Sequence, residues 1–194
     1  IISGFVIFMT LTRIRRSMDF VVSRFSRLFP AYWVAVGLTF AVVGIEGLPG
    51  KEVGGWQALS NLTMVHGLFG VPHVDGVYWT LEVELLFYAG MLVLHATGRL
   101  QQVHVVLWAL LAARLAYFVA AQAFGIDLPW TLYRLAILRY IPWFALGICI
   151  YQQLSWPPQA SRREPAITAL LSLACLLIVD GWVLALIGVA FAVL

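Results

Sequence analysis

The sequence predicts an all-α membrane protein, a polytopic bundle of transmembrane helices, and three observations support this prediction. Apolar residues make up 62% of the 194 residues and charged residues only 11%, whereas soluble domains hold about half and about a quarter. Apolar runs near the length of about 20 residues that crosses a hydrocarbon core recur between short polar connections. The alternation over about ten residues that marks a barrel strand is absent.

The first apolar run and the basic stretch that follows it set the expected orientation. Residues 1–11 read as the inner end of a truncated helix, because the chain opens on Ile within an apolar run, and we expect an internal fragment of a longer protein. Residues 12–27 hold five of the 12 basic residues. Short loops rich in Lys and Arg stay in the cytoplasm, so this stretch is predicted to be a cytoplasmic loop.

The next span is expected at 28–45, where Pro30 suits the first turn of a helix and Tyr32 and Trp33 suit the inner membrane interface. Its exit places residues 46–77 on the periplasmic side as the longest connection. This connection is rich in Gly, and we expect it to hold a short interfacial helix near residues 56–65.

The remaining spans follow from apolar runs separated by polar or Gly-containing turns. They are predicted at 78–96, 103–124, 135–151, 166–179 and 182–194, which gives about seven spans in a single domain covering 1–194. The inner side then holds eight basic residues and the outer side three, which agrees with the orientation. The inner eight are Arg13, Arg15, Arg16, Arg24, Arg27, Arg99, Arg162 and Arg163, and the outer three are Lys51, Arg134 and Arg139.

Three ionisable residues fall inside predicted spans, where an unpaired charge is costly and therefore marks a functional candidate. They are Glu82, Glu84 and Arg114. At about 1.5 Å per residue, Glu84 and Arg114 lie at similar depths, so we expect Arg114 to pair with one of the glutamates, with Arg139 as a further partner. The alternative is a purely structural ion pair. Glu82 and Glu84 are about 200° apart around a helix, so only one is expected to line a central cavity.

Other polar groups are given less specific roles. Ser3 and Gly4 lie near mid-membrane, where small residues either let helices pack closely or line a narrow passage for a thin substrate such as an acyl-pantetheine arm. Loop histidines such as His66 and His73 are irregularly spaced, so we expect solvated side chains and no metal site. His104 flanks an inner turn and is expected at the interface. The basic residues lie in loops, so their pattern predicts no nucleic-acid partner and a lipid bilayer instead.

Three stretches together resemble the acyltransferase 3 family, the bacterial multi-pass membrane O-acyltransferases. Residues 2–7, Ile-Ser-Gly-Phe-Val-Ile, resemble the end of the family's second helix, and residues 24–33, Arg-Phe-Ser-Arg-Leu-Phe-Pro-Ala-Tyr-Trp, resemble its arginine loop. Residues 78–88, Tyr-Trp-Thr-Leu-Glu-Val-Glu-Leu-Leu-Phe-Tyr, resemble its Tyr-Trp-[Ser/Thr]-Leu-x-x-Glu-x-x-Phe-Tyr signature, with Glu84 on the family's invariant acid.

The resemblance implies transfer of an acyl group, commonly acetyl, from cytoplasmic acyl-CoA to a hydroxyl of a periplasm-facing glycan or glycolipid at the bacterial inner membrane. It implies Arg24 and Arg27, with Ser3 and Gly4, on the donor side, and Glu84, Arg114 and Trp79 on the acceptor side. The family's catalytic histidine lies on a helix before Ile1, so this fragment alone is expected to be inactive. The alternative from another class is a transporter of an acidic or acylated solute.

Overall fold

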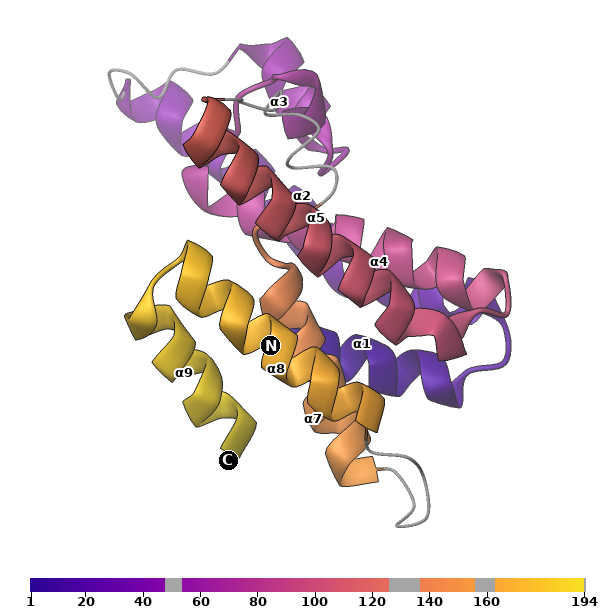
Figure 1. Cartoon of the computed structure of the whole chain (residues 1–194). Coiled ribbons are helices and arrows are strands. Elements are labelled where there is room, and N and C mark those ends of the chain that lie inside the picture. The colour runs from indigo at the N-terminus through magenta and orange to yellow at the C-terminus, as the bar shows by residue number, and fades with distance from the viewer. Residues whose placement is uncertain (48–53, 126–136, 156–162, 194) are drawn as a thin grey trace. The chain divides into compact units, whose positions relative to one another are not determined.

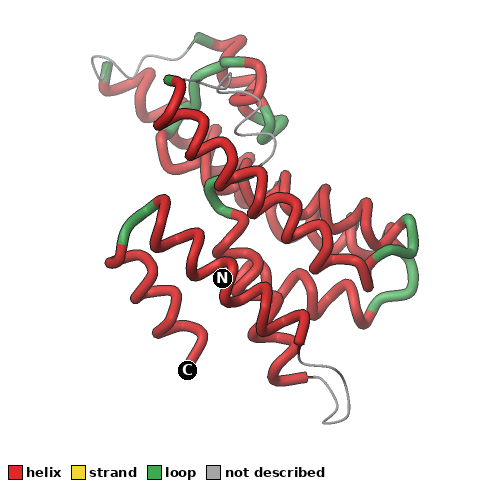
Figure 2. The backbone as a smooth tube through the Cα atoms, viewed as in Figure 1, coloured by secondary structure: helices red, strands yellow, loops and turns green. Residues whose placement is uncertain are grey.

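The computed structural model describes residues 1–47, 54–125, 137–155 and 163–193, and these residues form helices and turns without a strand (Figures 1 and 2). The predicted all-α fold is therefore confirmed. The described α-helices are α1 (Ile2–Arg13), α2 (Ser17–Glu46), α3 (Gly55–Asn61), α4 (Trp79–Ala96), α5 (Val103–Phe124), α7 (Ile141–Ser155), α8 (Arg163–Val179) and α9 (Trp182–Val193), and the 3-10 turns are η1 (His66–Phe69), η2 (Gly76–Tyr78) and η3 (Leu100–Gln102).

Within the described ranges, three helical segments are long and apolar enough to cross a membrane, namely Ser17–Glu46, Gly76–Ala96 and Leu100–Phe124. The other apolar helices are shorter, from the 12 residues of α1 to the 17 residues of α8. The prediction of about seven spans therefore stays a prediction. Helices α4 and α5 begin and end close to the predicted bounds, because each is a mainly apolar run between polar turns.

The predicted loop at 12–27 is wrong, because α2 already begins at Ser17 and only Ile14–Arg16 separates it from α1. Arginine is a good helix former, and Asp19 in the first turn complements the positive end of the helix dipole. Pro30 consequently lies inside the helix instead of in its first turn. At 30 residues, α2 is about 45 Å long, which exceeds a hydrocarbon core of about 30 Å.

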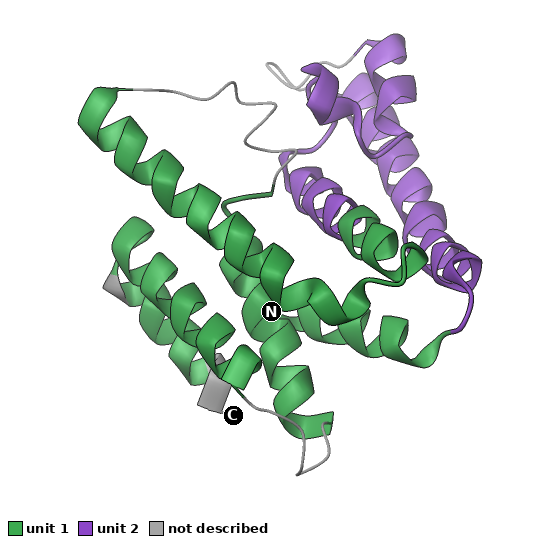
Figure 3. Ribbon diagram, turned by 45° about the vertical axis from the view of Figure 1, so that its right-hand side comes forward, with its two compact units in different colours: residues 1–14, 88–194 green, residues 15–87 purple. Residues whose placement is uncertain are grey.

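The chain divides into two compact units (Figure 3). Unit 1 comprises residues 1–14 and 88–194, and unit 2 comprises residues 15–87. In unit 2, the connection after α2 folds back onto that helix around a core of Tyr32, Val36, Met64 and Val74. Helix α3 confirms the short helix predicted in this connection.

Tyr32 and Trp33 hold the connection to α2. The Tyr32 hydroxyl donates to the carbonyl of Asn61 at 2.8 Å, and Trp33 Nε1 donates to the carbonyl of Leu62 at 3.0 Å. Tyr32 lies about 22 Å along α2 from Ser17, well away from the start of the helix. The placement of Tyr32 and Trp33 at the inner membrane interface stays a prediction, although the helix begins earlier than its hydrophobic run.

In unit 1, α1 runs parallel to α7. A Cβ added to Gly4 would lie 2.2 Å from the carbonyl oxygen of Phe144, and one added to Gly147 would lie 2.0 Å from that of Ile1. Further along both helices, the hydroxyls of Thr12 and Tyr151 are 3.0 Å apart. The two glycines therefore permit backbone contact between the helices, which is the packing role considered for small residues.

Helix α5 also runs parallel to its neighbour α8. His104 near the start of α5 bonds to Thr168 near the start of α8, and Arg114 pairs with Asp180 just beyond the end of α8. The last turns of α1 and α7 and the first turns of α5 and α8 lie together, because residues from all four line one cavity. We call this the inner end of unit 1, after the side on which the sequence places it.

Candidate functional site

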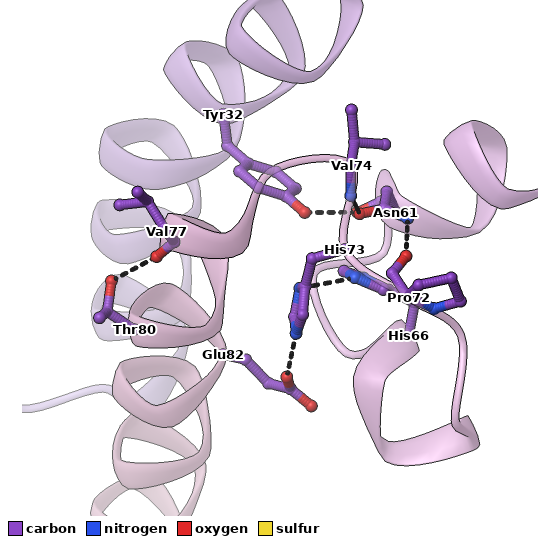
Figure 4. A network of polar contacts seen from close by, with 9 residues as sticks. All are labelled: Tyr32, Asn61, His66, Pro72, His73, Val74, Val77, Thr80 and Glu82. Carbon is purple, nitrogen blue, oxygen red and sulfur yellow. Dashed lines mark hydrogen bonds and ion pairs between the residues drawn. The ribbon is translucent and has the colours of Figure 1, made fainter. Parts of the chain in front are cut away.

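A buried chain of two imidazoles and a carboxylate lies in unit 2 (Figure 4). His66 Nε2 is 2.8 Å from His73 Nδ1, and His73 Nε2 is 3.6 Å from Glu82 Oε2. His66 is 2% exposed, and the side chains of His73 and Glu82 are 15% and 1% exposed. The expectation that His66 and His73 are solvated was therefore wrong.

Asn61 holds the loop that carries His73. Its amide nitrogen donates to the carbonyl of Gln57 at 2.7 Å. The same nitrogen donates to the carbonyl of Pro72 at 3.0 Å, and Oδ1 accepts from the backbone N–H of Val74 at 2.9 Å (Figure 4). These bonds fix the backbone on both sides of His73. Asn61 is fully buried, so the end of α3 and the loop before α4 are tied together at one residue.

These contacts make one continuous chain of polar side chains. Glu82 Oε2 faces His73 Nε2, and the other ring nitrogen of His73 shares a hydrogen bond with His66. Sequence reasoning missed this arrangement, because the three residues come from separate segments. The available signal was Glu82 itself, a carboxylate in the first turn of α4 that follows a loop with two histidines.

The structure places the predicted acceptor-side residues on α4. Trp79 is the first residue of the helix and is 39% exposed, which leaves its indole accessible. Glu84 is half-buried, whereas Glu82 is fully buried. The sequence motif had favoured Glu84, but Glu82 is the more buried of the two. The roles predicted for Trp79 and Glu84 stay predictions.

The predicted donor-side arginines lie one turn apart on α2, where side chains three positions apart are neighbours. Arg24 is 8% exposed and its guanidinium carbon lies 5.5 Å from the centre of the Phe20 ring, a cation–π arrangement. Arg27 is exposed. The helix therefore presents one arginine fixed by packing and one that is accessible to an anion, in place of two arginines on a loop.

Arg114 has a partner that the sequence reasoning did not name. Its Nη2 pairs with Asp180 Oδ2 in unit 1, and Arg114 is 1% exposed. Asp180 lies in the turn between the spans predicted at 166–179 and 182–194, and it had no predicted role beyond that turn. The pairing of Arg114 with a glutamate stays a prediction, and the Asp180 contact favours the structural alternative. Arg139 is exposed in the turn before α7 instead of inside a helix.

Ser3 and Gly4 were predicted on the donor side as well as in helix packing. The space that a side chain at position 4 would need is occupied by the backbone of Phe144. This geometry supports packing between α1 and α7. A passage for a substrate at Ser3 and Gly4 stays a prediction.

These features define a helical protein with membrane-crossing segments, buried ionisable groups and an exposed arginine on its longest helix. The family model described as the acyltransferase domain matches residues 1–193. The chain therefore belongs to the acyltransferase 3 family, as its three motifs indicated. No curated protein and no solved structure matches the chain. The family assigns the chain to acyl transfer, and the family is generally membrane-associated.

Proposed function

We propose that the protein transfers an acyl group from cytoplasmic acyl-CoA to a hydroxyl of a periplasm-facing glycan or glycolipid at the bacterial inner membrane. Acetyl is the acyl group that we propose in the first place. The observation that carries this proposal is the family match over residues 1–193. The Tyr-Trp-Thr-Leu signature begins at the end of η2 and continues into α4, beside the buried His73–Glu82 pair.

The acceptor half of the proposal rests on the first turns of α4. Trp79 offers an accessible aromatic face on which a sugar ring stacks. Glu82 is three positions later, on the neighbouring part of the helix surface, and is paired with His73. In this proposal Glu84 orients the acceptor hydroxyl or a histidine that belongs to the longer protein, and His73 and Glu82 support the same site.

The donor half rests on the arginines of α2. Acyl-CoA carries a 3′-phosphate and a pyrophosphate, and guanidinium groups match phosphate oxygens in geometry and charge. Arg27 is exposed and meets the phosphates directly, while Arg24 is held against Phe20 and adds positive charge from the adjacent turn. The alternative target for these side chains is the head group of an anionic lipid.

The test is transfer of label from [14C]acetyl-CoA to cell-envelope glycans by membranes that contain the full-length protein. We expect labelled glycan with wild-type protein and at least a hundredfold less with Glu84→Gln, at equal membrane content. The matched control on the same helix is Val93→Ala, because Val93 is 61% exposed. Wild-type turnover in Glu84→Gln would remove Glu84 from the site, and no labelling by wild-type protein would overturn the proposed reaction.

The proposed orientation has a separate test by impermeant thiol labelling. Single cysteines at Met18 and Phe69 are suitable, because these side chains are 66% and 80% exposed and the native Cys149 and Cys175 are buried. Gly70 is less suitable, since its φ of +74° disfavours a side chain. We expect the two cysteines to react from opposite sides of the membrane. Reaction from the same side would contradict the orientation.

A further inference from the structure

The charges of α2 indicate which part of this helix fits the hydrocarbon core. Arg27 and Glu46 bracket residues 28–45, which contain no Asp, Glu, Lys or Arg. At about 1.5 Å per residue this stretch is about 27 Å long, close to a core of about 30 Å. Exposed apolar side chains continue along it from Val34 to Ile45, which is 82% exposed. The outer boundary of the core is therefore expected near Glu46, and the inner boundary near Arg27.

The outer connection bonds to α2 far below that outer boundary. The carbonyls of Asn61 and Leu62 accept hydrogen bonds from Tyr32 and Trp33, and Trp33 lies about 20 Å before Glu46 along the helix. Helical side chains lean toward the N-terminus of their helix, so the bonded carbonyls lie at this depth or deeper. The connection thus returns beside α2 into the core, and both aromatic residues lie within the core in this alignment.

The start of α4 gives a second measure of depth. The hydroxyls of Tyr78 and Thr39 are 3.1 Å apart, and Thr39 lies about 10 Å before Glu46 along α2. His73 in the connection lies beside Glu82 in the first turn of α4 (Figure 4). The connection is therefore attached to both of its flanking membrane-crossing segments below the outer boundary.

The composition of the connection agrees with this depth. Residues 54–74 contain no Asp, Glu, Lys or Arg. A segment that stands in water has no reason to exclude charged side chains, whereas a segment in hydrocarbon does, because an unpaired charge there is costly. Backbone groups at this depth also need partners within the protein. Asn61 provides them on both sides of His73.

Helix α3 has apolar side chains on both of its faces. Ala58 and Leu62 pack against the core of unit 2. Trp56 and Leu59 are three positions apart, so they share the other face, and they are 78% and 60% exposed. An α-helix satisfies most of its own backbone groups, so this face can contact lipid.

The loop that follows α3 has different requirements. Phe69, Gly70 and Pro72 are exposed and lie outside any α-helix. Irregular backbone at membrane depth occurs only where it is buried in protein or lines water. Because these residues are exposed, this side of the connection requires water.

We propose that the outer connection is a re-entrant segment, inserted into the hydrocarbon core from the outer side, with Trp56 and Leu59 against lipid acyl chains and residues 69–72 against water. Lipid is the occupant of the α3 face, because α2 and α4 cross the same layer at the same depth and the face carries no charge. This placement differs from the periplasmic one predicted for residues 46–77. It involves neither the acyl donor nor the acceptor, so it does not depend on the proposed function.

The first experiment compares Leu59→Cys with Phe69→Cys in the full-length protein, in membrane fragments open to reagent from both sides. Both native side chains are highly exposed, so exposure alone predicts similar rates. We expect a charged, impermeant maleimide to react with Phe69→Cys at least tenfold faster, because hydrocarbon excludes both the reagent and the thiolate that it attacks. Equal labelling after denaturation in SDS is the control that both thiols are intact.

The second experiment identifies what covers the α3 face. The fluorescence of Trp56 is taken as the difference between wild type and Trp56→Phe in proteoliposomes. We expect lipids brominated along the acyl chain to quench at least half of this difference, and aqueous iodide to leave it unchanged. This measurement needs no cysteine variant, so it also covers the case in which Leu59→Cys does not fold.

Each contrary outcome overturns a stated part of the proposal. Equal maleimide rates at the two cysteines, or quenching of Trp56 by iodide, would show that α3 stands in water. A slow Leu59→Cys with no quenching of Trp56 by either agent would show that protein covers the face instead of lipid. A slow Phe69→Cys would show that the loop does not face water. None of these measurements uses acyl-CoA or glycan, so failure of the proposed reaction would leave them unaffected.

Discussion

Two buried amides show how differently the two units use polar side chains. Asn61 in unit 2 is fully buried, and both ends of its amide are hydrogen-bonded to backbone groups. Gln152 in unit 1 is 3% exposed, and it lies in the wall of a cavity against the side chain of His104. The first amide closes a loop. The second contacts another side chain instead of the backbone.

The histidines repeat this contrast. His66 and His73 bond to each other, and His73 also faces Glu82. His104 bonds to Thr168 through Nδ1, and its ring also lies against Gln152 in the wall of a cavity. The histidines of the outer connection are therefore enclosed by other side chains, whereas His104 lies beside a cavity. Substitutions that remove each group measure this difference.

Unit 1 also contains a buried ion pair, between Arg114 and Asp180. The largest effect on stability is expected from a substitution of Arg114. Arg114→Met leaves the Asp180 carboxylate without its partner, and breaking a buried ion pair costs about 3–5 kcal/mol. Denaturant or thermal unfolding in a mild detergent measures the loss. Arg114→Met combined with Asp180→Leu should recover most of it. Single and double variants of equal stability would show that the pair is not coupled.

A smaller loss is expected for Asn61→Leu, a change that keeps the side-chain volume and removes the amide. The carbonyl of Pro72 and the N–H of Val74 lose their partner, and each buried group left without one costs about 1–3 kcal/mol. The melting temperature should fall, and labelling of Phe69→Cys should accelerate as the loop loosens. Ser60→Ala on the same helix is the control, since its hydroxyl is exposed. An unchanged melting temperature would contradict the role of Asn61.

The part of the structure that the sequence predicts is the part that depends on local pattern. The bounds of α5 follow from an apolar run that no Pro or Gly interrupts. The start of α2 was missed, because basic residues mark the side of a membrane but do not stop a helix. Residues 12–27 were predicted to be a loop only because their basic side chains indicate the cytoplasmic side of a membrane.

Tertiary partners were the part that sequence patterns could not provide. The separation between Arg114 and Asp180 is 66 residues, and their contact depends on the parallel packing of α5 and α8. The same packing places Thr168 against His104, 64 residues away, and turns a residue expected at the interface into a buried one. Glu82 and Glu84 were correctly separated by face, but no local pattern showed that His73 lies beside Glu82.

The smallest effect on stability, and the sharpest test of the comparison, is expected for Gln152→Met. The change removes a buried amide that bonds to no backbone group among the described residues and whose only side-chain contact of this kind there is with His104. Removing a polar group of this kind is nearly neutral or stabilising, and we expect a change of less than about 1 kcal/mol in unfolding free energy. Asn61→Leu is the matched change at an amide that is fully bonded. If Gln152→Met instead destabilised the protein as strongly as Asn61→Leu, Gln152 would be a structural amide, and the contrast between the two units would be lost.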